Sequence, residues 1–375
     1  MNLIRNVFFL YTMNTNLKLP YHDLEQSKLI FSKDLKKWYL KNSRQLPWRC
    51  NKEDPNYPYK ILVSEFMLQQ TGVKTVIPYF ERFIAKWPDI KSLAKASENE
   101  ILKYWQGLGY YSRGRNLLKS AKIIDLDYNG IIPNNLDDLL SLPGIGSYAS
   151  AAIRLIGFDK KATVIDGNVK RVIARFFALS GKLKDNEKDI SLLAKYLTPN
   201  KGNANYSQAI MEFGALICTP RQSSCSECIM SHGCLSLKQG LVLEIPEAKT
   251  QTNKKNLRCA SFLAIDKNNL VLIAKRKNES LLKNMWQLPS SDWINQSNNK
   301  KLLSQAPFKA KWSETGKKIN YKFSHINLLN ETYTANISLK IDLFDKDFKW
   351  VSIKALHKYP LVTLTKKILL DNNLI

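Results

Sequence analysis

The sequence predicts a multidomain protein in which an all-α domain is followed by a smaller α+β domain. Between Ser27 and about Leu237, apolar residues recur at helical spacing, and glycine or proline interrupts them at short intervals. From Arg258 onward, short runs rich in β-branched and aromatic residues are bounded by turn residues, which is typical of strands. The length of 375 residues fits two or three domains of ordinary size.

The change of composition along the chain also sets the expected boundaries. We expect an N-terminal extension over 1–27, either a disordered segment or one that partly precedes a translation start at Met13. The all-α domain is expected over 28–238, and the α+β domain over 258–375. The polar, lysine-bearing segment 239–257 between them is interpreted as a linker.

Individual elements follow from the spacing of apolar residues. The expected helices are Asn56–Thr71, Val76–Lys86, Glu98–Trp105, Arg113–Leu126, Leu136–Leu142, Tyr148–Ile156, Val169–Leu179 and Tyr206–Cys218. In the second domain a hairpin is expected around the turn Asp266–Asn269, and the expected strands are Arg258–Ile265, Leu270–Lys275, Phe323–Ile326, Thr332–Ile337 and Lys340–Phe344.

The charge of the chain indicates a polyanionic partner. There are 57 Lys and Arg against 32 Asp and Glu, a net charge of +25, and the pI is near 9.7. Such a field favours nucleic acid or an anionic membrane surface, although a lysine-rich proteome would produce the same excess. No apolar run approaches the length of about eighteen residues that a membrane span needs, so a soluble protein is expected.

Four of the six cysteines lie close together, with the spacing Cys-x6-Cys-x2-Cys-x5-Cys. This clustering does not suit a secreted disulfide framework, and it indicates a metal or cluster site in a reducing compartment. No signal peptide is recognisable at the N-terminus, so we expect a cytoplasmic protein. The clustered residues are Cys218, Cys225, Cys228 and Cys234.

A glycine-containing turn, Leu142–Gly146, separates two expected helices. Gly144 and Gly146 permit a tight turn with exposed backbone N–H groups, next to the positive end of the following helix. Such a turn binds a DNA phosphate without reading sequence. The same five residues also fit an ordinary turn between helices.

Two carboxylates stand out as candidates for acid–base chemistry. Glu65 shares a helix face with apolar residues, where desolvation would raise its pKa, unless the carboxylate reaches solvent at the edge of that face. Asp166 precedes a helix, where it fits both an N-cap and a carboxylate oriented towards a substrate. Hydrolysis of a glycosidic bond uses two carboxylates in different environments. The two residues are 101 positions apart, so the sequence itself does not place them together.

A family resemblance supplies that placement. Five motifs resemble, in the same order and at similar spacing, those of the MutY family of adenine DNA glycosylases in the endonuclease III-like helix–hairpin–helix superfamily. The similarity is close over 28–238 and looser over the remainder. The motifs are Leu62–Thr71, Gly107–Arg113, Leu142–Gly146, Ile165–Arg171 and the cysteine cluster.

The resemblance implies an enzyme that flips adenine out of double-stranded DNA and removes it when it is mispaired with 8-oxo-guanine or guanine. It implies that Glu65 protonates the leaving adenine and that Asp166 stabilises the deoxyribosyl cation, with Tyr148 and Asn168 in support. We expect a monomer that acts on the nucleoid. The positions implied to hold or wedge the DNA strand are Gln70, Thr71, Leu108 and Tyr110, with core packing as the alternative above all for Leu108.

Two further expectations come from the resemblance. Superfamily members that cut the DNA backbone carry a lysine after the hairpin glycines, whereas this chain has Tyr148, which cannot form a Schiff base. The enzyme is therefore expected to be monofunctional. The cysteine spacing matches the 4Fe–4S loop of the family over 218–234, while a zinc site usually pairs two short Cys motifs.

The C-terminal region resembles the Nudix-like recognition domain of the same family. The resemblance implies that Ser324 and His325, in the triplet Phe323-Ser324-His325, contact 8-oxo-guanine. The acidic magnesium box of a true Nudix hydrolase is missing between Trp286 and Pro307, so no pyrophosphatase activity is expected.

Two rival functions remain open at this point. One is a thymine mismatch glycosylase of the same superfamily, some members of which also carry tyrosine at the lysine position. The other is a non-catalytic DNA-binding protein. The C-terminal domain argues against the first, and the presence of both Glu65 and Asp166 argues against the second.

Overall fold

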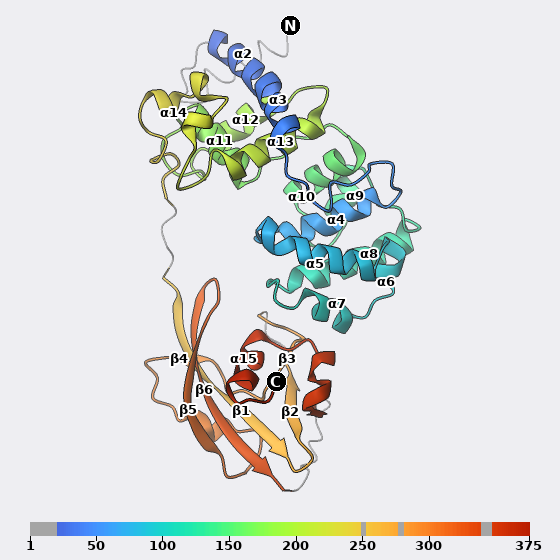
Figure 1. The fold of residues 1–375 in the computed structure, drawn as a ribbon, viewed down its shortest axis with the longest axis vertical. Helices are drawn as coiled ribbons and strands as arrows, with labels where there is room; N and C mark the ends of the chain where they lie inside the picture. The colour runs from blue at the N-terminus through green and yellow to red at the C-terminus, as the bar shows by residue number, and fades with distance from the viewer. Residues whose placement is uncertain (1–20, 249–252, 277–280, 339–346) are drawn as a thin grey trace. The chain divides into compact units, whose positions relative to one another are not determined.

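The computed structural model describes residues 21–248, 253–276, 281–338 and 347–375 (Figure 1). The chain forms two compact units, Met1–Gln69 with Leu126–Thr250 and Gln70–Asp125 with Gln251–Ile375. The chain therefore passes between the units inside the helical region, and each unit is described separately below. None of the described helices is long and apolar enough to cross a lipid bilayer.

The first unit is built from helices. Near its N-terminal end the π-helical turn Ile30–Asp34 joins two α-helices. A second π-helical turn, Ile153–Gly157, directly follows the helix Ser147–Ala152. The α-helices are α2 (Tyr21–Leu29), α3 (Leu35–Asn42), α4 (Tyr57–Leu68), α9 (Leu136–Ser141), α10 (Ser147–Ala152), α11 (Gly167–Phe176), α12 (Glu187–Leu197), α13 (Asn203–Leu216) and α14 (Leu235–Lys238).

Aromatic contacts hold the core of this unit together. Phe31 meets Phe176 of α11 edge-to-face with 4.9 Å between ring centroids, and Trp38 of α3 meets Phe213 of α13 at 5.2 Å. Helices α11 and α13 approach closely at Gly214, where a Cβ atom would lie 2.7 Å from the Cβ of Asn168. Only glycine fits there without moving one helix.

The second unit combines helices from the middle of the chain with a sheet from its C-terminal part. The helices are α5 (Val73–Lys86), α6 (Ile90–Ala94), α7 (Glu98–Trp105) and α8 (Ser112–Asp127). Capping boxes at Asp89 and Ser97 begin α6 and α7. The buried ring of Trp105 packs against Phe83 and lies directly below Gly114 of α8, so these helices are fixed around one tryptophan.

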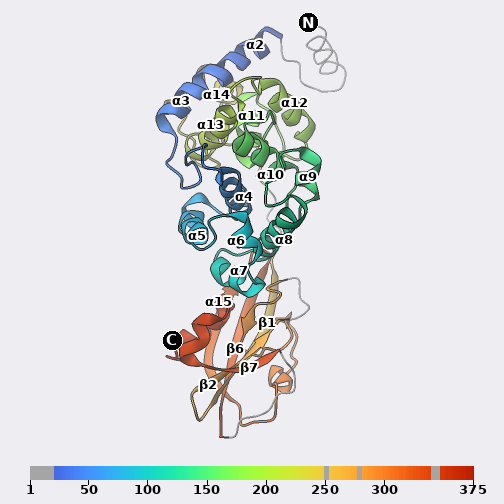
Figure 2. The ribbon, with the colours of Figure 1, turned by 90° about the vertical axis from the view of Figure 1, so that its right-hand side faces the viewer.

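The sheet of the second unit has the order β3-β2-β1-β6-β5, with β4 on β1 and β7 on β2. Its strands β1, β2, β6 and β7 can be followed in Figure 2. Strands β1 and β6 run parallel and side by side along their whole length, from Lys255↔Ile326 to Asp266↔Ile337. The strands are β1 (Lys255–Asp266), β2 (Leu270–Lys275), β3 (Trp286–Gln287), β4 (Ile294–Asn295), β5 (Ser313–Lys322), β6 (Ile326–Ile337) and β7 (Phe348–Ser352), and the chain ends in helix α15 (Thr363–Asp371).

Most predicted elements are present, with ends that differ by a few residues, and the β1–β2 hairpin is confirmed by the pair Ile265↔Val271. The prediction of a strand over Phe323–Ile326 is wrong, because this segment is the loop between β5 and β6, and only Ile326 belongs to a strand. The predicted strand Lys340–Phe344 lies outside the described residues. Helices α2, α3, α6, α12, α14 and α15 were not predicted.

Two predicted boundaries also need correction. The extension over 1–27 is wrong for its last part, because α2 begins at Tyr21 and Leu24 lies in the hydrophobic core. The linker 239–257 is wrong at both ends. Ile245 is only 2% exposed and packs in the core of the first unit, and β1 already begins at Lys255.

Candidate active site

Glu65 lies on α4, in surroundings that oppose its charge. The side chain is 6% exposed, and its neighbours Leu62, Val63 and Phe66 are fully buried. Burial raises the pKa of Glu65 to about 8, and the negative charge of Asp166 adds to this rise, while a hydrogen bond with Tyr148 opposes it. The interpretation of Glu65 as a buried carboxyl is confirmed, and at neutral pH the group holds its proton.

Asp166 caps the N-terminus of α11, as its position before an amphipathic helix predicts. Its Oδ1 accepts the backbone N–H of Val169 at 2.7 Å, and its Oδ2 accepts the Asn168 side-chain amide at 2.8 Å. Burial raises the pKa of Asp166, whereas these hydrogen bonds and the nearby Arg171 lower it. Hydrogen-bond donors of this kind favour the charged form of a carboxylate.

Tyr148 joins the two carboxyl groups into one site. It lies on α10, directly after the hairpin, and its hydroxyl shares a hydrogen bond with Glu65. The same hydroxyl donates to Met211 Sδ of α13 at 3.6 Å. Burial and the neighbouring carboxylates raise the pKa of Tyr148, so it stays neutral. The structure thus brings together Glu65, Asp166, Tyr148 and Asn168 from α4, α10 and α11.

An arginine that sequence reasoning missed supports the cap of α11. Arg171 donates to the side-chain oxygen of Asn168 at 2.9 Å and to the backbone oxygen of Gly214 at 2.6 Å. Its Nε atom donates to the backbone oxygen of Cys218 at 2.8 Å. A continuous set of hydrogen bonds therefore runs from Asp166 through Asn168 and Arg171 to the first clustered cysteine. In the sequence, the position of Arg171 within the motif Ile165–Arg171 was the signal that could have identified it.

The four clustered cysteines line one cavity in the first unit. The cavity lies against Arg175, which is 2% exposed and donates to the carbonyl oxygens of Thr219, Pro220 and Ile245. Arg175 also contacts Cys218 Sγ at 3.5 Å. Among the described residues, no three His, Cys, Asp or Glu side chains converge as the ligands of a single metal ion. The thiols are Cys218, Cys225, Cys228 and Cys234.

The chemistry of these thiols fits a cationic group in the cavity. Burial raises the pKa of Cys228 to about 12 and also raises the pKa values of Cys225 and Cys234, and the other thiols of the cluster add to the rise. Thiolates so close together need a positive centre to be stable. A buried arginine and an iron–sulfur cluster both satisfy that need, so the donor set fits a 4Fe–4S group.

The turn Leu142–Gly146, the hairpin between α9 and α10, has the geometry expected of an exposed turn. Gly144 adopts a φ of +84°, which L-residues rarely adopt, and its carbonyl accepts the Gln69 side-chain amide at 3.2 Å. Gly146 is extended and precedes the first turn of α10, with no atom within 4 Å of the position where a Cβ would lie. Its backbone is therefore open to an approaching phosphate.

Of the predicted strand-holding residues, four lie in the second unit. Gln70 and Tyr110 adopt positive φ angles of 58° and 45°, and Thr71 accepts a hydrogen bond from Arg113 at 3.0 Å. Tyr110 is 46% exposed, whereas Leu108 is 5% exposed. Core packing, the alternative kept for Leu108, describes that residue, and Tyr110 is the side chain available to a ligand.

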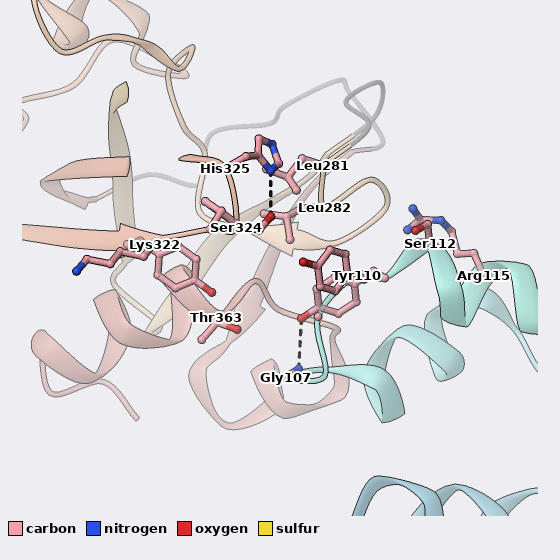
Figure 3. Close-up of a pocket in the computed structure, with 14 residues that line it drawn as sticks. Gly107, Tyr110, Ser112, Arg115, Leu281, Leu282, Lys322, Ser324, His325 and Thr363 are labelled. Atoms are coloured by element: carbon pink, nitrogen blue, oxygen red, sulfur yellow. Dashed lines mark hydrogen bonds between the residues drawn. The ribbon is translucent and has the colours of Figure 1, made fainter. Parts of the chain in front are cut away.

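A cavity of about 430 Å³ in the second unit brings Tyr110 to the predicted recognition triplet (Figure 3). Ser324 and His325 line the same cavity, and Ser324 Oγ lies 3.1 Å from His325 Nδ1. Further polar lining comes from Arg115, Lys322 and Thr363. Aromatic, cationic and hydroxyl groups around one cavity suit a purine of a DNA strand.

Sequence reasoning also missed a buried ion-pair network beside the site. Glu212, next to Met211 on α13, accepts two hydrogen bonds from the Arg44 side chain at 2.7 and 2.9 Å and one from Arg49 at 2.9 Å. These bonds hold the pKa of Glu212 at about 2 although burial opposes its charge. A glutamate on an otherwise apolar helix face was the only signal, and its partners are more than 160 positions away.

Comparisons with known proteins agree with this arrangement. Residues 63–199 match the model of the HhH-GPD superfamily base excision DNA repair protein, and residues 260–371 match the NUDIX domain model. An adenine DNA glycosylase from Buchnera aphidicola subsp. Schizaphis graminum (strain Sg) is 33% identical, covering 91% of this chain and 98% of that protein. Another, from Buchnera aphidicola subsp. Baizongia pistaciae (strain Bp), is 35% identical and covers 81% of each.

Among solved structures, a thermostable thymine-DNA glycosylase is similar to the helical part of the chain. It is 30% identical, superimposes with a TM-score of 0.52, and covers 57% of this chain and 98% of its own.

Proposed function

The chain belongs to the adenine DNA glycosylases, and on that premise we propose that it excises adenine mispaired with 8-oxo-guanine or guanine without cutting the DNA backbone. The family relationship makes it a base-excision repair enzyme that binds DNA. One observation supports the proposed chemistry above all: Glu65 is protonated in an apolar setting beside Asp166, which is held by two hydrogen bonds.

The two carboxyl groups suit the two halves of N-glycosidic bond hydrolysis. We assign Glu65 as the general acid that gives its proton to the departing adenine, because burial keeps it protonated at neutral pH. We assign Asp166 as the anion that stabilises the positively charged sugar, because its hydrogen bonds orient it. Tyr148 and Asn168 hold these two groups in place. Adenine reaches them by leaving the base stack.

Base release from three duplexes tests the proposal. We expect single-turnover release of adenine from duplexes that contain A:8-oxo-guanine and A:G, and no release of thymine from a T:G duplex. Release from T:G alone would replace the proposal with a thymine mismatch glycosylase. Binding of all three duplexes without any base release would identify a non-catalytic DNA-binding protein.

We further propose that the 430 Å³ cavity reads the 8-oxo-guanine strand. Ser324 and His325 offer hydrogen-bonding groups, and the exposed ring of Tyr110 offers a stacking surface on the same cavity. Gln70 and Thr71 supply polar groups for the strand, and the backbone at Gly144 and Gly146 supplies a phosphate contact. We do not assign Leu108 to the wedge, because it is buried.

The absence of an amine at position 148 predicts a monofunctional enzyme. Incubation with borohydride and an A:8-oxo-guanine duplex should give no covalent complex, because a phenol forms no Schiff base with the sugar. The matched variant Tyr148→Lys supplies an amine at the same place and serves as the positive control. Efficient capture of the unmodified protein would contradict the prediction.

We propose a 4Fe–4S cluster on Cys218, Cys225, Cys228 and Cys234. When bound, the cluster supplies a cationic centre that stabilises the four thiolates. Through Arg171 and Arg175, the loop that carries these cysteines fixes the position of α11. We expect the purified protein to be brown and to contain about four iron atoms per chain, measured by elemental analysis. A colourless protein with zinc and no iron would contradict this assignment.

The net charge of +25 suits a monomer that acts on chromosomal DNA in the cytoplasm, and we propose this setting. Each phosphate that a lysine or arginine neutralises should steepen the log–log salt dependence of duplex binding by about 0.9.

A further inference from the structure

We propose that Met211 is a positioning residue for the glycosylase reaction, because its sulfur accepts a hydrogen bond from the Tyr148 hydroxyl and thereby keeps the Glu65 carboxyl protonated. The inference rests on the proposed role of Glu65 as the acid, and it assigns a function to a thioether outside the predicted catalytic set.

The geometry gives the Tyr148 hydroxyl two competing partners. In the described part of the chain, it hydrogen-bonds to the Glu65 carboxyl and donates to Met211 Sδ at 3.6 Å, a normal distance for a sulfur acceptor. A hydroxyl can donate one hydrogen bond and can accept another. Met211 lies half-buried on α13 and packs against the core, so its sulfur is held beside the hydroxyl.

The direction of the Tyr148–Glu65 hydrogen bond depends on the charge of Glu65. An ionised Glu65 can only accept, so the phenol proton must turn towards it and Met211 loses its donor. A protonated Glu65 donates a hydrogen bond to the phenol oxygen and keeps its proton, and the phenol O–H then needs another acceptor. Met211 is that acceptor. Met211 therefore stabilises the protonated form of Glu65 and does not stabilise the ionised form.

Without the sulfur, protonation of Glu65 would leave the O–H of the part-buried Tyr148 without a partner in the protein. That cost would favour the ionised carboxylate and lower the pKa of Glu65. A thioether is a weak acceptor, so the phenol proton can turn back to Glu65 once the acid has given its proton to adenine. A stronger acceptor would hold the phenol proton and oppose that step.

The remaining charged groups do not account for this effect. Asp166 is the charge that acts on Glu65, and it stays in place whether or not position 211 carries sulfur. The other charged side chains on the elements packed around the site have partners of their own: Lys60 pairs with Asp54, Arg154 donates to the Asn134 carbonyl, Lys170 pairs with Glu187, Arg171 donates to Asn168, Arg175 donates to the Thr219 carbonyl, and Glu212 pairs with Arg44 and Arg49.

The test is a titration of Glu65 in the free holoenzyme and in Met211→Leu. The carboxylic acid stretch of Glu65 is followed by infrared spectroscopy against pH and identified by its loss in Glu65→Gln. Leucine keeps the volume and removes the acceptor, so the fold is retained. We expect the midpoint for Glu65 to fall by about half a pH unit in Met211→Leu.

A double-mutant comparison separates the hydrogen bond from packing. In a Tyr148→Phe background, Met211→Leu should leave the Glu65 midpoint unchanged, because no phenol proton remains to be accepted. The matched control Met285→Leu removes a buried methionine from the second unit and should leave the Glu65 midpoint unchanged. An unshifted midpoint in Met211→Leu, or an equal shift in the Tyr148→Phe background, would overturn the inference.

The rate of adenine release should follow the same titration. The reaction needs protonated Glu65, so the rate is present below its pKa, about 8, and is lost as the pH rises through it. In Met211→Leu this alkaline limb should move to lower pH by the same amount as the infrared midpoint. An enzyme that releases no adenine would refute the proposed function, while the infrared titration would still decide the role of Met211.

Discussion

Glu65→Gln is expected to abolish adenine release, with a fall of at least about 10³-fold in the single-turnover rate, while duplex binding should stay close to that of the unmodified protein. The amide keeps the shape of the side chain but has no proton of suitable acidity to give to the leaving base. Burial no longer opposes a charge at this position, so the variant is expected to be at least as stable as the parent.

The measurement pairs base release with a binding assay on the same A:8-oxo-guanine duplex. Glu53→Gln, an exposed change of the same chemistry, should leave both unaltered. Turnover close to that of the parent in Glu65→Gln would show that another group supplies the acid. Loss of binding together with turnover would show that Glu65 acts on the DNA rather than on the bond.

Asp166→Asn is expected to lower the rate by about 10²- to 10³-fold, because it removes the negative charge that we propose stabilises the developing sugar cation. Asparagine is as good an N-cap as aspartate, so α11 should begin at the same residue and thermal stability should change little. The variant therefore separates the two roles that the position of Asp166 suggests.

Asp166→Ala is the matched comparison, because it removes both the charge and the cap. We expect the same loss of rate, together with a loss of about 1 kcal/mol in the free energy of unfolding. Both quantities are measured, by base release and by denaturant titration. If Asp166→Asn kept the rate of the parent, the residue would be a cap and no more.

The sequence predicts the features of the site that depend on near neighbours. The cap at Asp166 depends on a bond to Val169, three positions away, and the burial of Glu65 follows from the apolar spacing of its own helix. The meeting of Glu65 with Asp166 and Tyr148 depends on packing between α4, α10 and α11, which only the fold or a family resemblance supplies.

Other features were not predicted because they depend on contacts with residues far along the chain, or because their own sequence carries no regular apolar pattern. Arg44 and Arg49 look like surface residues in a polar segment, and only their ion pairs with the distant Glu212 identify them as part of the interior. Strand β5, Ser313–Lys322, was not predicted because most of its side chains are exposed lysines and other polar residues, so no alternation of apolar residues marks it. Ile245 looked like part of a linker because its burial depends on helices earlier in the chain.

The close approach of α11 and α13 at Gly214 also determines how this enzyme responds to random mutation. Every replacement adds at least a Cβ atom, which would press on Asn168 and disturb its bond to Asp166. A glycine codon stays glycine after any change at its third base, whereas a change at either of the first two bases gives another residue or a stop codon. Damage at this codon is therefore either silent or harmful to the repair activity itself.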